Sequence, residues 1–168
     1  MRCFIIAALS ADGFIAKNES HAAFWTSKED KKRFIELTKR AGVIVMGKNT
    51  WKTIGSPLRE RVNIVYTHEP TIEGAETTQL SPPELLKELE DRNFKEVAVC
   101  GGSQIYTMFM KAGVIDTLYV TIEPVLFGQG IKLFNEEMTH QLTLRNIEKA
   151  ESGALLLEYK VNFGGPQN

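Results

Sequence analysis

Asp30 is the side chain best placed for chemistry in this sequence, because an aromatic residue follows it one helical turn later. Residues 27–40 have the apolar spacing of an amphipathic helix. Residues four apart share one face of a helix, so Asp30 is expected beside Phe34. A carboxylate partly desolvated by a ring can bind or protonate a cationic nitrogen heterocycle. The alternative is helix capping, because Ser27 as N-cap makes Asp30 the third helical residue.

Two glycine turns, each between a buried strand and a helix, are candidates for phosphate binding. They are residues 46–50, Met-Gly-Lys-Asn-Thr, and residues 100–104, Cys-Gly-Gly-Ser-Gln. Glycine lets a ligand approach the backbone, and the N–H groups at a helix start favour an anion. Neither turn is a dinucleotide fingerprint or a P-loop, and a simple turn requirement explains each equally well. Two such turns at the carboxyl ends of parallel strands favour the ligand site.

Polar side chains near these turns extend the candidate site. Lys48 and Thr50 would bring an ammonium and a hydroxyl group to one phosphate, and Thr67 with His68 would add two more groups at the same sheet edge. A solvated surface lysine is the alternative for Lys48.

Arg61 is a candidate for carboxylate binding. If the fold places it at the mouth of the groove that holds Asp30, its guanidinium could bind a carboxylate through two hydrogen bonds. Otherwise Arg59 and Arg61 are both surface residues beside a proline turn. The three histidines have no spacing that suits a metal or a catalytic triad, so no metal site is expected.

The elements that must position these residues alternate between apolar strands and amphipathic helices, which predicts an α/β sheet with helices on its faces. Residues 11–24 are expected as a loop. The last three strands have no helices between them, which predicts an antiparallel edge. Strands are expected at residues 3–10, 42–47, 62–67, 97–100, 117–125, 139–149 and 154–163, and helices at 27–40, 49–54, 81–91 and 103–112.

Composition limits the class of protein and its partners. A chain of 168 residues that is 43% hydrophobic suits one globular domain, expected over residues 1–163 with a disordered tail at 164–168. With 20 basic and 21 acidic residues and no long apolar run, neither nucleic acid nor membrane is an expected partner. Cys3 and Cys100 lie in apolar runs, which favours buried free thiols and a reducing compartment. We expect a cytoplasmic protein, either a monomer or a weak dimer.

Taken in order, these motifs resemble the dihydrofolate reductase family over nearly the whole chain. The resemblance implies a single α/β domain with a mixed, mostly parallel twisted sheet of about eight strands, about four helices and an antiparallel C-terminal edge. The residues that carry it are 6–9, 45–51, 54–58, 61–65 and 101–106, with Trp25, Asp30, Phe34 and Thr38.

The resemblance implies reduction of 7,8-dihydrofolate to 5,6,7,8-tetrahydrofolate, with roles for the residues at the substrate end. Asp30 would hydrogen-bond the amidine edge of the pterin, and Trp25 would order a water molecule near it. Thr121 would be linked to the same carboxylate. Arg61 would bind the α-carboxylate of the folate glutamate. The substrate slot would be lined by Ile6, Ala8, Phe34, Ile54, Leu58 and Cys100.

The resemblance also implies NADPH as cofactor, bound along the two glycine turns. Gly101–Gly102 matches a glycine pair whose peptide bond is cis in this family. The residues implied in cofactor binding are Ala8, Ile15, Gly47, Lys48, Asn49, Thr50, Thr67, His68, Gly101, Gly102, Ser103, Gln104, Ile105 and Tyr106.

Parts of the chain resemble instead the riboflavin-pathway pyrimidine reductases, which share the fold. These parts are residues 10–16, Ser-Ala-Asp-Gly-Phe-Ile-Ala, and residues 123–130, while Lys31 stands where folate reductases commonly have an apolar wall residue. The alternatives are therefore reduction of an aminopyrimidine ribosyl phosphate, or a non-catalytic relative that binds pterins or nucleotides. Asp30 and Arg61 together favour folate, because a ribityl phosphate needs neither an amidine partner nor a carboxylate clamp.

Overall fold

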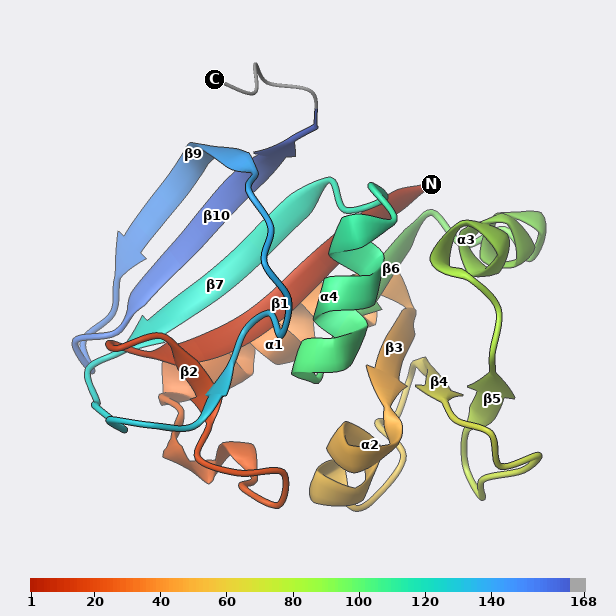
Figure 1. The fold of residues 1–168 in the computed structure, drawn as a ribbon, viewed down its shortest axis with the longest axis horizontal. Coiled ribbons are helices and arrows are strands. Elements are labelled where there is room, and N and C mark those ends of the chain that lie inside the picture. The colour runs from red at the N-terminus through yellow and green to blue at the C-terminus, as the bar shows by residue number, and fades with distance from the viewer. Residues whose placement is uncertain (164–168) are drawn as a thin grey trace.

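An eight-stranded sheet with the order β5-β4-β3-β6-β1-β7-β10-β9 forms the centre of the fold (Figure 1). The computed structural model describes residues 1–163, and the tail predicted at 164–168 lies outside the described residues. The strands are β1 (Arg2–Ser10), β3 (Val43–Gly47), β4 (Val62–Tyr66), β5 (Glu76–Thr78), β6 (Glu96–Val99), β7 (Thr117–Glu123), β9 (Gln141–Lys149) and β10 (Leu155–Asn162).

Parallel pairing holds the sheet from β5 to β7, and β10 then pairs antiparallel with both β7 and β9. The four helices are α1 (Lys28–Ala41), α2 (Lys48–Ile54), α3 (Pro82–Asp91) and α4 (Ser103–Lys111). The predicted fold class, with its mostly parallel sheet and antiparallel C-terminal strands, is confirmed.

Helices cover both faces of the parallel part of the sheet, which is why its strands are continuously apolar. On β1, Phe4 packs in the cluster on the α1 side, whereas its neighbour Ile5 packs in the cluster that contains α3 and α4 residues. Figure 1 shows α4 in front of β1 and α1 behind the sheet. No helix within residues 1–163 is long and apolar enough to cross a membrane.

The predicted loop at residues 11–24 contains two short elements, so this part of the prediction was wrong. Strand β2 (Phe14–Ala16) pairs with β8 (Ile131–Lys132) in a separate two-stranded sheet, and the 3-10 helix η1 (Ala23–Trp25) follows. Strand β5 was also not predicted. Three residues are too few to show a period, and the partner of β2 lies more than a hundred residues away, so no local pattern marked these elements.

Both cysteines are expected to be unreactive in the folded protein. Burial raises the pKa of the Cys3 thiol well above its usual range and that of Cys100 to about 12, and only the thiolate is a good nucleophile. Iodoacetamide at pH 8 should therefore modify neither residue in the native state and both in guanidinium chloride, as mass spectrometry would measure. Rapid native modification of either thiol would contradict the burial described here.

Candidate active site

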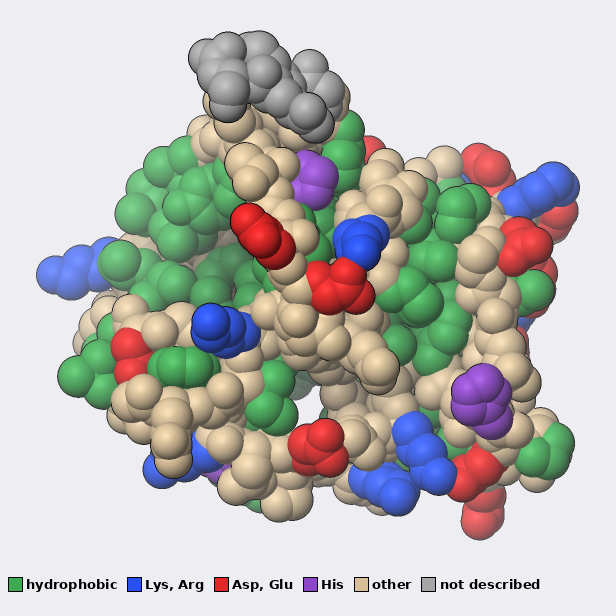
Figure 2. Space-filling view, in the orientation of Figure 1, with side chains coloured by type: hydrophobic (Ala, Val, Ile, Leu, Met, Phe, Trp, Pro, Cys, Tyr) green, Lys and Arg blue, Asp and Glu red, His purple; other side chains and the backbone are tan. Residues whose placement is uncertain are grey.

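One large cleft, of about 2870 Å³, lies at the carboxyl ends of the parallel strands, where open α/β sheets bind their ligands. Its volume exceeds that of a typical pocket for one small ligand, roughly 300–1,000 Å³, so two ligands fit side by side. Figure 2 shows this face hollowed between the segment after β2 and the segment that contains α2. Every residue predicted for the site lines the cleft except Thr121.

Asp30 reaches the cleft because another carboxylate performs the capping function at the start of α1. Glu123, buried at the end of β7, accepts hydrogen bonds from the backbone N–H and the hydroxyl of Ser27, both at 2.8 Å. In a capping box the third helical residue would accept that N–H itself. Here Asp30 only donates its own N–H to Ser27 Oγ, at 3.3 Å, and its carboxylate has no recorded hydrogen bond within residues 1–163. The capping interpretation of the Asp30 side chain is therefore not supported.

Thr121 is the one predicted site residue that lies outside the cleft lining. It is buried on β7, opposite Ala8 of β1 in the strand register. Among the described residues no hydrogen bond joins its hydroxyl to Asp30, so its link to that carboxylate stays a prediction.

Trp25 lies at the rim of the cleft within a small aromatic cluster. Its ring stacks on that of His21, with centroids 6.3 Å apart, and meets the edge of Phe127 at 4.9 Å. Phe127 follows β7, whereas His21 and Trp25 follow β2, so the cluster joins two segments that are distant in sequence. Trp25 therefore has a defined position beside the end of α1 that carries Asp30.

Asp12 fixes the same two segments to each other, a function the sequence analysis missed. Its carboxylate accepts the hydroxyl of Ser10 at 2.7 Å and the backbone N–H groups of Phe127 and Gly128, at 3.1 and 2.7 Å. The hydrogen bond from Ser10, together with those from the two backbone groups, holds the pKa of Asp12 below its usual range. Asp12 thereby positions Phe127, which contacts Trp25.

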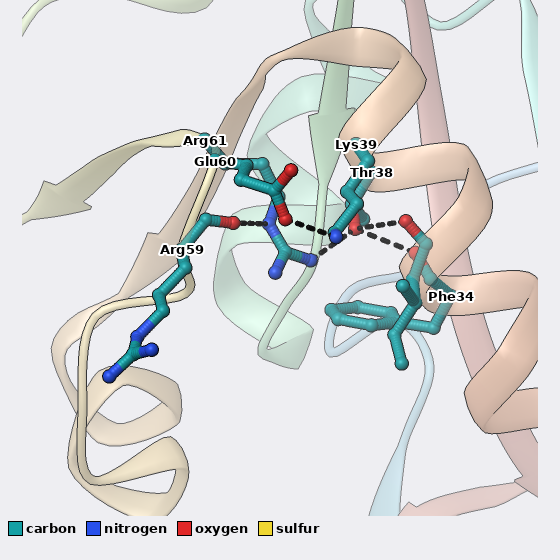
Figure 3. Close-up of polar contacts among 7 residues, drawn as sticks. Phe34, Thr38, Lys39, Arg59, Glu60 and Arg61 are labelled. Atoms are coloured by element: carbon teal, nitrogen blue, oxygen red, sulfur yellow. Dashed lines mark hydrogen bonds and ion pairs between the residues drawn. The ribbon is translucent and has the colours of Figure 1, made fainter.

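Arg61 lies in the cleft with its guanidinium held from the side of α1 (Figure 3). Its Nη1 donates to Thr38 Oγ1 at 2.8 Å and its Nε donates to the carbonyl of Arg59 at 2.9 Å. Thr38 is buried and donates its own hydroxyl to the carbonyl of Phe34 at 2.6 Å. The structure gives Nη2 no bond within residues 1–163, so this edge of the fork is free for a carboxylate. Arg59 does not line the cleft.

The two glycine turns meet at the other end of the cleft. The N–H of Gly47 donates to the carbonyl of Gly101 at 2.8 Å, and a Cβ on Gly47 would lie 3.1 Å from the side chain of Ile105. The Gly101–Gly102 peptide bond is cis, as the resemblance implies. The ends of β3 and β6 thus approach closely enough for one ligand to contact both turns.

Two buried hydroxyl groups that line the cleft lack a hydrogen-bond partner among the described residues. They are Ser103 Oγ, on the first residue of α4, and the hydroxyl of Tyr66, at the end of β4. Buried polar groups nearly always find a partner, in the protein, in water or in a ligand. Together with the free N–H groups at the start of α4, Ser103 provides the donor set that a phosphate group prefers.

The cationic side chains predicted to bind phosphate have partners of their own. Lys48 forms an ion pair with Glu69, which holds the pKa of Glu69 below its usual range, and His68 Nδ1 lies 2.8 Å from Gln79 Oε1. A phosphate at this edge must therefore displace Glu69 from Lys48. Within residues 1–163 no group of three or more His, Cys, Asp or Glu side chains is arranged to hold a metal ion.

Replacing Glu123 should loosen the start of α1. Glu123→Ala leaves the Ser27 N–H and hydroxyl without their acceptor, and hydrogen bonds to a charged group contribute about 1.5–3 kcal/mol each. We expect the free energy of unfolding to fall by roughly 2–4 kcal/mol, measured by urea titration. Glu36→Ala, an exposed change on the same helix, is the control and should alter stability by less than about 0.5 kcal/mol. A Glu123 variant as stable as the wild type would contradict this account of α1.

Comparison with known proteins identifies the family. The sequence model of the family described as dihydrofolate reductase matches residues 2–152. A dihydrofolate reductase of Buchnera aphidicola is 31% identical over 130 residues, covering 76% of this chain and 75% of that protein. The uncharacterized protein YwjB of Bacillus subtilis is 25% identical over 149 residues, 82% of this chain and 84% of that one.

The fold is shared more widely than the sequence. The crystal structure of a putative riboflavin biosynthesis protein from Shewanella sp. PV-4 superposes with a TM-score of 0.84 at 20% identity, covering 97% of this chain and 100% of that one. At this identity the likeness describes the fold alone. The family match over most of the sequence decides the assignment, and the chain belongs to the dihydrofolate reductase family.

Proposed function

We propose that the protein reduces 7,8-dihydrofolate to 5,6,7,8-tetrahydrofolate, with NADPH as the hydride donor. The observation that carries this proposal is one stripe of α1, in which Asp30, Phe34 and Thr38 are spaced by four residues and Thr38 binds Arg61. At 1.5 Å per residue, the carboxylate turn and the guanidinium turn are about 12 Å apart along the helix. This spacing suits a substrate with a protonatable heterocycle at one end and a carboxylate at the other.

The apolar walls between these two charged groups would orient such a substrate. Asp30 would accept two hydrogen bonds from the amidine edge of a pterin. Phe34, Ile54 and Leu58 line the intervening cleft, and the free Nη2 of Arg61 would help bind the carboxylate of the glutamate tail. Water held near Asp30 and Trp25 would deliver the proton to pterin N5 as the reduction proceeds.

The residues at the glycine turns fit a phosphate-bearing cofactor. NADPH, when bound, supplies the hydride that is transferred to pterin C6. The start of α4 with Ser103 would hold its diphosphate, and Lys48, Thr50, Thr67 and His68 would hold the 2′-phosphate once Glu69 is displaced. The unpartnered Ser103 hydroxyl supports this placement, because a phosphate oxygen would satisfy it.

The second candidate is NADPH-dependent reduction of an aminopyrimidine ribosyl phosphate. Lys31 favours it, because this residue lines the cleft beside Asp30, where its ammonium group donates to the carbonyl of Thr26 and adds a cation for an anionic substrate. Asp12 favours it as well, since it joins the two segments whose sequences resemble the riboflavin-pathway enzymes.

A parallel assay distinguishes these candidates. Oxidation of NADPH, followed by its absorbance, should be at least about tenfold faster in kcat/KM with dihydrofolate than with the aminopyrimidine ribosyl phosphate, and faster with NADPH than with NADH. The reverse order of substrates would replace the folate proposal with the second candidate. No oxidation with either substrate would indicate a binding protein without catalysis.

Asp30→Asn should nearly abolish dihydrofolate reduction at neutral pH. An amide cannot accept two hydrogen bonds from the pterin edge or favour its protonation, and such a contribution is typically worth about 10²–10⁴-fold in rate. Stability should be almost unchanged, because the Asp30 backbone N–H still reaches Ser27. Steady-state kinetics with Glu36→Gln as the control would measure the effect. An Asp30 variant that kept more than about a tenth of the wild-type kcat/KM would exclude the carboxylate from the reaction.

Arg61→Ala should weaken dihydrofolate binding selectively, by about 2–4 kcal/mol, because a shielded bidentate contact exceeds an ordinary charged hydrogen bond. Turnover of dihydrobiopterin, a pterin without a glutamate tail, should barely change. Arg59→Ala is the matched control, since Arg59 does not line the cleft and uses only its backbone carbonyl toward Arg61. An equal loss with both substrates would mean that Arg61 supports the fold and does not bind the tail.

A further inference from the structure

An apolar row runs along β9, the strand at one edge of the sheet. Leu142, Leu144 and Ile147 are exposed by 40%, 49% and 55%. A globular protein exposes single apolar residues routinely, but three on one strand form a contiguous feature. None of the residues of β9 lines the ligand cleft, so substrate or cofactor binding does not explain the row.

The row continues onto the neighbouring strand. In the antiparallel register Leu142 lies opposite Val161, Leu144 opposite Tyr159 and Ile147 opposite Leu157. Residues paired in this way point to the same face of a sheet. We call Leu142, Leu144, Ile147, Leu157 and Tyr159 the β9–β10 apolar face.

The β9–β10 apolar face lies on the α4 side of the sheet but beyond the reach of that helix. Tyr159 and Leu157 are paired with Leu118 and Val120 of β7, which pack in the cluster that contains α4 residues. Figure 1 shows α4 in front of β1, with no helix of the described chain in front of β9 or β10. Figure 2 shows hydrophobic side chains gathered over these two strands.

No charge interrupts this face. Thr143, Asn146 and Glu148 pair with Lys160, Glu158 and Leu156, so the charged groups of these pairs lie on the opposite face of the two strands. Covering the β9–β10 apolar face therefore desolvates no buried ion, and a partner needs an equally uncharged apolar row. A second copy of this chain presents such a row by necessity.

We propose that the β9–β10 apolar face binds the same face of a second copy to form a twofold dimer. The exposed fractions correspond to a patch of roughly 400 Å² per copy, the size at which exposed apolar patches are often functional. Two patches bury about 800 Å² of apolar surface, which at the apolar share of homodimer contacts, about 65%, implies an interface of about 1,200 Å². This area is at the lower limit for a specific complex, so the dimer dissociates on dilution.

The test is the mass of the wild-type chain between about 1 and 100 μM, a range that covers weak specific association. Sedimentation should show the mass rising from 18.9 kDa toward twice that value. Leu144→Glu should raise the dissociation constant at least about 100-fold, because a twofold interface contains each substitution twice. Ile35→Glu is the matched control, since Ile35 is 47% exposed on α1, behind the sheet, and this variant should dimerise like the wild type.

Amide hydrogen exchange of the wild type provides a measurement that needs no variant to fold. Exchange at high concentration should be slower in β9 and β10 than at low concentration, and unchanged in α1. A wild-type chain that stays monomeric at about 100 μM would overturn the proposal. A dimer that Leu144→Glu leaves intact, or one whose slowed exchange maps to other elements, would overturn it too.

Discussion

The contact between Glu123 and Ser27 determines how the rest of the site is arranged. It fixes the first turn of α1 against the end of β7, and every group that α1 brings to the cleft depends on that turn. Asp30 and Phe34 follow directly, and Arg61 follows through Thr38. A buried carboxylate with two charge-assisted hydrogen bonds is strong enough to hold this arrangement. The same contact leaves the Asp30 carboxylate available for a ligand.

The opposite end of the cleft is organised by backbone contacts. Gly47 and Gly101 join the two strand ends through one hydrogen bond, and Gly47 leaves space for Ile105 that a side chain would fill. Side chains there are mutually paired, as Lys48 and Glu69 are. The substrate end is thus preorganised by side chains, whereas anion binding at the other end rests on the backbone at the start of α4 and on an ion pair that must open.

Local sequence patterns predicted the parallel strands, the four helices and the position of the cleft, because strand and helix periods and glycine turns are properties of neighbouring residues. The motif register also separated Arg61, which lines the cleft, from Arg59, which does not. The contacts that complete the site were not predictable in this way. Glu123 is 96 residues from Ser27 and Asp12 is 115 residues from Phe127, and no period or motif links such pairs.

Asp12 makes one mechanical unit of the segments that follow β1 and β7. Three hydrogen bonds converge on a single carboxylate, so a displacement of either segment is transmitted to the other and to the aromatic ring of Trp25. The coupling requires the ionised carboxylate. Because its pKa is lowered in the folded state, the coupling persists through neutral and mildly acidic pH and is lost only when the pH falls through that lowered value. An insertion in one segment would therefore demand a compensating change in the other.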